Sequence, residues 1–345
     1  MTQCGYANKG LCILPMGKTA PCCVINTGPL EYFKGLDQFF EGEPFSSIRK
    51  ANENNNVLAS NWCSMCKLHE ERGEISLRQR LVNNPIKDTS ETVVPRLLDI
   101  SFGNTCNLDC VMCSQDYSSK WASTHGKNPE VAELIGQPTN AKSSTLSYTQ
   151  IDKILSISPN LERVIIKGGE PLYDKKALYF LEKLQVLNKN VTLNLVTNLT
   201  LLTDKTLRIL SSYKNINIIV SIDGIGDVYK WIRGYDWDIV DKNIQKCIDK
   251  NIKTSIQFTI TAFNIGQLED TYQYYKQKGL RANFIFANQP WVHYSNVGVD
   301  KLKNIVANVT APVEIPIIEP EDSERFIQFT NIMNKQRDLV WEDIC

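Results

Sequence analysis

The sequence has no excess of either charge, since 38 lysines and arginines are matched by 38 aspartates and glutamates among 345 residues. Binding to the phosphates of a nucleic acid depends on a basic surface. We therefore expect no nucleic-acid partner. The chain also has no low-complexity tract and no internal repeat beyond an alternation of strands and helices, which excludes a solenoid.

Long apolar runs are also missing, because none approaches the roughly 20 residues of a membrane-spanning helix. No secretory signal opens the sequence. We expect a cytoplasmic protein with no membrane contact and, at 42% hydrophobic residues, a full-size core. Histidine is scarce at 3 residues. His125 and His293 are isolated and are expected to be structural, although His293 lies just past a predicted strand and could face substrate.

Cysteine, by contrast, is plentiful. Its count of 11 is odd, and without a secretory signal a disulfide framework is not expected. Cys106, Cys110 and Cys113 have the spacing CxxxCxxC and follow a predicted buried strand at 97–102. Three close thiolates can hold three irons of a 4Fe–4S cluster and leave the fourth iron open. A zinc site is the alternative, but this loop offers no fourth Cys or His.

A CxxxCxxC loop after a first strand resembles the radical S-adenosylmethionine (SAM) enzymes. The resemblance implies that Cys106, Cys110 and Cys113 hold a 4Fe–4S cluster whose open iron binds the amino and carboxylate groups of SAM. The residue before the third cysteine is usually aromatic in this family and is Met112 here. A thioether can supply a similar apolar contact.

Apolar, β-branched runs alternate with amphipathic stretches after this loop, which predicts an α/β fold with a parallel sheet covered by helices. The predicted strands are 97–102, 161–166, 191–196, 216–221, 255–260 and 282–287, and the predicted helices are 176–188, 237–250 and 321–337. The resemblance implies that these form a partial (β/α)6 TIM-type barrel, with the chemistry at the C-terminal ends of its strands. In helix 237–250 the apolar face should hold Ile239, Val240, Ile244 and Ile248, with Cys247 as a core residue.

Three segments are expected. Residues 1–92 would form a small cysteine-rich auxiliary domain, 93–300 the core barrel, and 301–345 a C-terminal helical extension. The joint between the first two is predicted at 83–92, and a looser region is predicted at 289–300.

The ends of the predicted strands carry unusual residues. Paired glycines let a ligand approach the backbone, and a carboxylate can accept hydrogen bonds from an ammonium group. By resemblance, the GGEP motif binds the amino group of SAM, the SxDG motif lies near its methionine or ribose, and an arginine pairs with its carboxylate. These positions are Gly168, Gly169, Glu170, Pro171, Asn198, Ser221, Asp223 and Arg233. The alternative for Arg233 is a solvated surface side chain.

A second group of cysteines precedes the barrel. Cys12, a Gly/Pro turn with Cys22, and the pair Cys63 and Cys66 supply four thiolates, enough to close a metal site. The segment resembles the auxiliary-cluster half-motif of twitch and SPASM-type radical SAM proteins, and the resemblance implies a second 4Fe–4S cluster. Cys23 could replace Cys22, and a structural zinc site is the alternative. Cys4 and Cys345 lie near the two ends of the sequence, and no role is assigned to them.

The resemblance implies an enzyme that cleaves SAM reductively to a 5′-deoxyadenosyl radical, which abstracts hydrogen from a substrate. An external donor of the flavodoxin or ferredoxin type would supply the electron. A peptide or protein substrate is expected, because auxiliary clusters of this type commonly occur in peptide-modifying enzymes. The alternatives are chemistry on a sugar or nucleotide and, less favoured by the ordered motifs, a non-catalytic iron–sulfur or zinc protein.

Overall fold

The computed structural model describes residues 3–15, 17–25, 30–83, 86–87, 92–136, 145–337 and 339–341. The chain has an α/β fold with a mostly parallel sheet, as predicted. It divides into two compact units. The first comprises Met1–Asn104, Ser143–Leu195 and Arg208–Ile216, and the second comprises Thr105–Lys142, Val196–Leu207 and Asn217–Cys345.

The strands of the first unit follow the order β2-β1-β3-β4-β5. β1 (Gly10–Ile13) pairs antiparallel with β2 (Thr19–Ala20) and parallel with β3 (Leu97–Ile100). β4 (Arg163–Ile166) pairs parallel with β3 and with β5 (Thr192–Thr197). All four residues of β1 are buried. The N-terminal cysteine segment therefore shares a sheet with β3.

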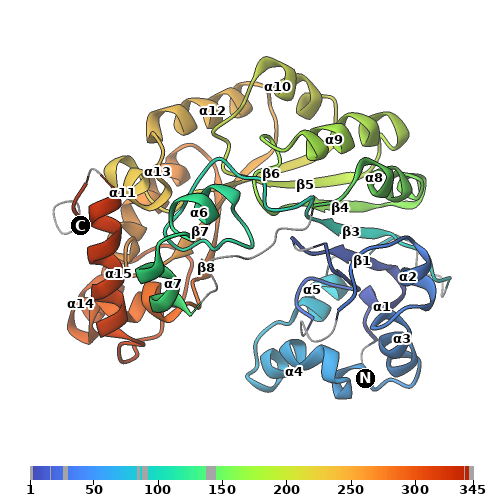
Figure 1. Cartoon of the computed structure of the whole chain (residues 1–345), viewed down its shortest axis with the longest axis horizontal. Helices are drawn as coiled ribbons and strands as arrows, with labels where there is room; N and C mark the ends of the chain where they lie inside the picture. Colours follow the sequence, from blue (N-terminus) through green and yellow to red (C-terminus); the bar gives the residue numbers. More distant parts are fainter. Residues whose placement is uncertain are drawn as a thin grey trace. The chain divides into compact units, whose positions relative to one another are not determined.

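Helices cover this sheet. Figure 1 shows α8 (Tyr148–Leu155) and α9 (Lys175–Leu187) beside β4 and β5. Ser147 and Gln150 form a capping box that starts α8, and Phe180 and Leu184 of α9 are fully buried. The other helices of this unit are α1 (Tyr6–Lys9), α2 (Asp37–Glu41), α3 (Phe45–Glu53), η1 (Val57–Ala59), η2 (Asn61–Cys63), α4 (Ser64–Glu71), α5 (Leu77–Asn83) and η3 (Ser158–Asn160).

In the second unit, β7 (Thr254–Ile260) pairs parallel with β6 (Asn215–Ser221) and with β8 (Arg281–Phe286). β6 begins in the first unit, and α10 (Asp204–Ser211) ends there. The remaining helices are α6 (Ser119–Thr124), α7 (Pro129–Ile135), α11 (Gly226–Arg233), α12 (Trp237–Asp249), η4 (Ile265–Gln267), α13 (Leu268–Gln277), η5 (Pro290–Val292), η6 (Tyr294–Val297), α14 (Val299–Val306) and α15 (Ser323–Gln336).

An aromatic cluster forms a core of the second unit. Trp231 of α11 lies 4.7 Å from Phe263, measured between ring centroids. Phe329 and Met333 of α15 are fully buried in the same cluster. The C-terminal helix predicted at 321–337 is therefore confirmed, and it packs through its apolar face.

Each predicted strand is confirmed to within two residues at either end, and so are the three predicted helices. Cys247 is fully buried, as expected, whereas Ile239 is 40% exposed, so its assignment to the core face was wrong. The region 289–300 is not loose, because η5, η6 and the start of α14 occupy it. Most of the joint predicted at 83–92 lies outside the described residues, as does Cys345.

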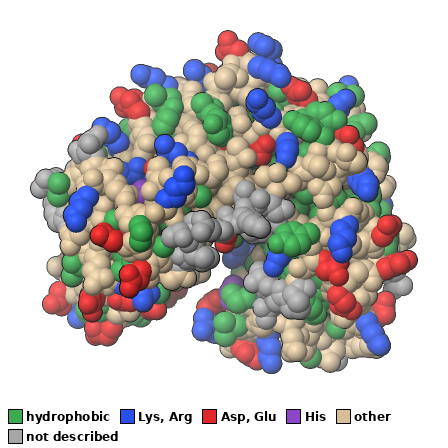
Figure 2. Space-filling model, in the orientation of Figure 1, with side chains coloured by type: hydrophobic (Ala, Val, Ile, Leu, Met, Phe, Trp, Pro, Cys, Tyr) green, Lys and Arg blue, Asp and Glu red, His purple; other side chains and the backbone are tan. Residues whose placement is uncertain are grey.

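The surface agrees with the zero net charge. On the face shown in Figure 2, lysine and arginine side chains are interspersed with aspartate and glutamate. Among the described residues, no helix has both the length and the apolar character needed to cross a membrane.

Candidate active site

The CxxxCxxC loop leaves β3 and ends at α6. Burial raises the pKa of Cys110 and of Cys113, and the nearby thiols of Cys110 and Cys106 raise that of Cys113 further. The backbone N–H of Leu108 donates to Cys106 Sγ over 3.5 Å. Three soft, closely spaced thiols in a mostly buried loop are a donor set that fits an iron–sulfur cluster.

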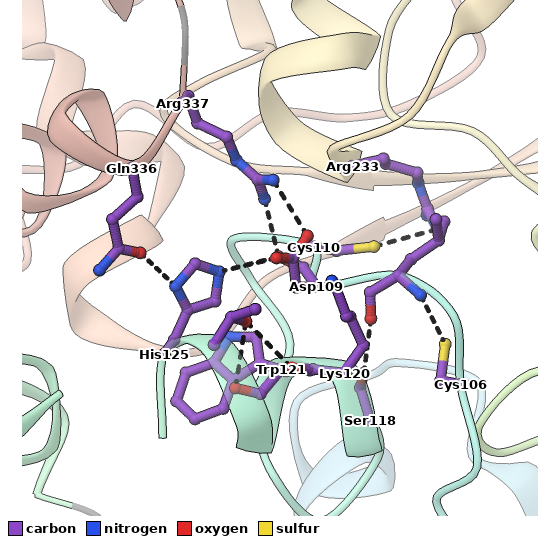
Figure 3. Close-up of polar contacts among 12 residues, drawn as sticks. Cys106, Asp109, Cys110, Ser118, Lys120, Trp121, His125, Arg233, Gln336 and Arg337 are labelled. Atoms are coloured by element: carbon purple, nitrogen blue, oxygen red, sulfur yellow. Dashed lines mark hydrogen bonds and ion pairs between the residues drawn. The ribbon is translucent and has the colours of Figure 1, made fainter. Parts of the chain in front are cut away.

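Asp109, inside the cysteine motif, fixes this loop to the C-terminal helix. Arg337 Nη1 lies 3.0 Å from Asp109 Oδ1, and its Nη2 donates to the Asp109 carbonyl oxygen over 2.8 Å. His125 Nε2 lies 3.2 Å from the same carbonyl oxygen, and its Nδ1 contacts Gln336 Oε1, as Figure 3 shows. Burial lowers the pKa of His125, which suits a neutral structural ring. The structure thus supports the structural role expected for His125.

An ion pair lies directly behind Cys110. Arg233, at the end of α11, places Nη2 2.5 Å from Asp223 Oδ2. Its Nη1 lies 3.8 Å from Cys110 Sγ, a contact that Figure 3 shows. Asp223 is fully buried and Arg233 is 8% exposed, so Arg233 is not a solvated surface residue. Asp223 Oδ1 also accepts the backbone N–H of Thr259 over 2.8 Å. Cys110 of the cysteine motif therefore lies next to Arg233, which in turn pairs with Asp223.

Burial disfavours the guanidinium charge, but Asp223 and Cys110 outweigh that cost and raise the pKa of Arg233. The arginine stays charged. A guanidinium beside a cysteine sulfur stabilises the thiolate that binds a metal.

Asn198, after β5, also reaches the cysteine loop. Its Nδ2 donates to Asn107 Oδ1 over 3.1 Å, and its Oδ1 accepts the backbone N–H of Thr200 over 3.0 Å. Ser221 ends β6 and is half-buried. Within the second unit, the structure therefore groups Asn198, Asp223 and Arg233 around the cysteine loop.

The GGEP turn belongs to the first unit. Gly168 and Gly169 have φ angles of 82° and 56°, which residues other than glycine rarely adopt. A Cβ on Gly168 would lie 2.7 Å from Ser101 Cβ and still nearer to Ser101 Oγ. In the described part of the chain the buried Ser101 Oγ has no hydrogen-bond partner. Close backbone approach and an unsatisfied hydroxyl fit a polar ligand.

Glu170 is 1% exposed and accepts the backbone N–H of Leu172 over 2.9 Å. Pro171 is buried next to it. This hydrogen bond fixes the carboxylate within the turn that precedes α9.

The N-terminal cysteines share one apolar core cluster, which contains Cys12 and against which Cys4, Cys22, Cys23 and Cys63 pack. Cys22, Cys63 and Cys66 line one apolar cavity, together with Cys4. Cys12 and Cys23 lie near Asp99 and Lys167 instead. Among the described residues, no set of three or more His, Cys, Asp or Glu side chains is arranged to hold a metal ion, and this includes the CxxxCxxC cysteines.

Sequence reasoning missed the contacts of Asp109 with Arg337 and His125, and it missed Cys4. Asp109 and Arg337 are 228 residues apart, so no local pattern links them. Cys4 had a signal, because it is a cysteine ahead of a cysteine-rich segment.

Residues 100–275, just over half of the chain, match the family model of the radical SAM superfamily. The protein belongs to this superfamily. Its cofactors are accordingly a 4Fe–4S cluster and SAM. No curated protein matches the chain.

Several solved structures are similar in part. Native anSMEcpe with bound AdoMet is 22% identical, with a TM-score of 0.45 over 56% of this chain and 53% of that one. The chain thus matches about half the length of that protein. Streptococcus suis SuiB bound to the precursor peptide SuiA is 15% identical, with a TM-score of 0.46 over 89% and 70%. The methyltransferase TsrM from Kitasatospora setae is 13% identical, with a TM-score of 0.40 over 67% and 46%.

Proposed function

We propose that the protein is a radical SAM enzyme that modifies a peptide or protein and that carries a second, auxiliary 4Fe–4S cluster of the twitch or SPASM type. One observation carries the proposal: the chain has two sets of buried or partly buried cysteines, one in each compact unit. The set on the CxxxCxxC loop suffices for SAM cleavage. The second set has no role in that step, which favours a second metal centre.

Cys106, Cys110 and Cys113 would hold the first cluster. With SAM bound, the cluster would supply the electron for reductive cleavage of SAM, the chemistry that leads to hydrogen abstraction from the substrate. The protein's own part is to hold and tune the site. Asp109 anchors the loop through Arg337, and Arg233 donates to Cys110 Sγ.

SAM would be held by the motifs assigned from the sequence. Gly168 and Gly169 expose backbone to the ligand, and Glu170 accepts from its amino group. In the second unit, the positions that the sequence motifs assign to SAM are the polar side chains of Asn198, Ser221 and Asp223. The pairing of Arg233 with Asp223 favours a role in positioning and charge over direct binding of the SAM carboxylate.

The domain boundaries and partners belong to the same proposal. The core would be a partial (β/α)6 barrel at 93–300, flanked by the auxiliary segment at 1–92 and a C-terminal extension at 301–345. Cys22, Cys63 and Cys66 would be three ligands of the auxiliary cluster, for which the sequence gives Cys12 as the fourth. A cytoplasmic flavodoxin or ferredoxin would be the electron donor.

The test uses short peptides encoded beside the gene, each co-expressed with the enzyme and analysed by mass spectrometry. The expected result is a mass change in one peptide that is absent when Cys110→Ala replaces the parent. The double variant that carries both Cys63→Ala and Cys66→Ala should still form 5′-deoxyadenosine but should no longer modify the peptide. If the enzyme modified a sugar or a nucleotide and left every peptide unchanged, that result would contradict the assignment of a peptide substrate. Equal loss of both products in the double variant would return the N-terminal segment to a scaffolding role.

A further inference from the structure

Four cysteines surround one cavity in the first unit. Its lining includes Cys4, Cys22, Cys63 and Cys66, and the rest of the wall is mainly apolar: Ala7, Ile25, Ile48, Val57, Leu58, Trp62 and Leu77. Cys12 is not part of this wall. The four side chains are not arranged around a metal ion in this structure, but four thiols that line one apolar cavity are the residue types of a closed, four-thiolate metal site.

The backbone around the thiols suits thiolate ligands. Cys63 is the N-cap residue of α4, and Cys66 lies in its first turn. Free N–H groups at a helix start favour an anionic sulfur.

Cys4 is also held in place although it is near the start of the chain. Its backbone N–H donates to Asn52 Oδ1 of α3 over 2.6 Å. Arg78 of α5 borders the cavity. Arg78 is 6% exposed and is paired with Glu70. A fixed cation near the thiolates compensates part of their charge.

Cys12 has different neighbours. It lies on β1, in register with Asp99 of β3. Lys167 Nζ lies 2.7 Å from Asp99 Oδ2. Cys12 packs in the same core cluster as Cys63, but it lies beside this ion pair and does not line the cavity.

We propose that Cys4, Cys22, Cys63 and Cys66 are the four ligands of the auxiliary cluster, and that Cys12 is not one of them. This assignment rests on the proposed function, because it names the ligands of the cluster proposed there. It replaces Cys12, which the sequence spacing suggested, with a cysteine some eight positions earlier. Cys23 lines a second cavity with Asp99 and Arg163, which Cys22 also borders, but Cys23 does not line the first cavity and stays a packing residue.

The experiment measures iron and acid-labile sulfide in anaerobically reconstituted protein. The background carries Cys106→Ala, Cys110→Ala and Cys113→Ala, so that only the auxiliary cluster contributes, at about four irons per chain. Into this background we introduce Cys4→Ala, Cys12→Ala or, as the control, the buried Cys247→Ala. Electron paramagnetic resonance after mild oxidation reports the type of cluster. Circular dichroism confirms folding, and Cys4→Ser provides a second variant that keeps the size of the side chain.

We expect Cys4→Ala and Cys4→Ser to lose iron, or to give a three-iron signal because one iron lacks its thiolate. Cys12→Ala should match Cys247→Ala, with about four irons and an unchanged spectrum. Loss in Cys12→Ala equal to or greater than that in Cys4→Ala would overturn the ligand assignment and leave the auxiliary cluster intact. Absence of iron from the background protein itself would overturn the cluster, and stoichiometric zinc there would replace it with a structural site.

Discussion

The buried pair of Asp223 and Arg233 makes a strong prediction for stability. Asp223→Asn keeps the side chain's shape and its acceptor for the Thr259 N–H, so it removes little except the charge. Arg233 would then be buried beside Cys110 without its counter-ion. Breaking a buried pair by removing one partner costs about 3–5 kcal/mol. We expect a loss of this size.

Asp241→Asn is the matched control. Asp241 pairs with Lys278 at 2.6 Å, close to the 2.5 Å of the buried pair, but its side chain is 22% exposed where that of Asp223 is fully buried. More exposed pairs contribute about 0–1 kcal/mol. Urea unfolding of both variants, followed by tryptophan fluorescence, compares the two losses, since Trp231 and Trp237 lie on α11 and α12. Losses that agree within about 1 kcal/mol would refute the reasoning from burial.

The same variant should change the redox behaviour of the loaded protein. Reduction adds negative charge to the cluster, and the Asp223 carboxylate acts electrostatically on Cys110. Without this carboxylate, reduction becomes easier and the potential moves to a more positive value. A redox titration monitored by electron paramagnetic resonance measures the shift, and a shift to more negative values would contradict the assigned role.

Two further predictions concern a glycine and a carboxylate. Gly168→Ala and Gly136→Ala both place a side chain at positive φ, which costs about 1–2 kcal/mol each. Only the alanine at 168 also clashes with Ser101. Gly168→Ala should therefore lower the unfolding temperature more than Gly136→Ala does, and it should also weaken SAM binding. Burial disfavours the Glu269 carboxylate, but hydrogen bonds from Thr310, Gln273 and the backbone outweigh this and lower its pKa to about 2. A depressed pKa stabilises the fold above the unfolded value of about 4.3 and loses this as the pH falls toward 2, so parent stability should drop over that window more steeply than that of Glu269→Gln. Equal slopes in the two acid titrations would contradict the second prediction.

The fold could be predicted where local pattern decides it. The run Ile216–Ser221 is apolar and β-branched, and β6 covers Asn215–Ser221. β1 escaped prediction because Gly10–Ile13 is short, and its parallel pairing joins Gly10 to Leu97 far along the chain. Ile239 has the right spacing for the buried face of α12, yet it is exposed because neighbouring elements, which sequence spacing does not reveal, determine how much of that face is covered.

The candidate site shows the same division. CxxxCxxC, GGEP and SxDG are contiguous motifs, so their residues could be identified from the sequence. The contact of Arg337 with Asp109 depends on how α15 packs against the cysteine loop, and the two residues are 228 positions apart in the sequence. The position of Cys4 depends on α3, because Asn52 holds its backbone. Spacing predicted which residue types matter, but not which of two cysteines reaches the cavity.

SAM cleavage without substrate tests the central claim most directly. Anaerobically reconstituted, reduced protein is given SAM, and 5′-deoxyadenosine is measured over time by chromatography. The account predicts slow formation by the parent and none by Cys110→Ala, because two thiolates cannot hold the cluster in place with one iron open. Equal formation by both proteins, or none by a parent that has its full iron content, would contradict it.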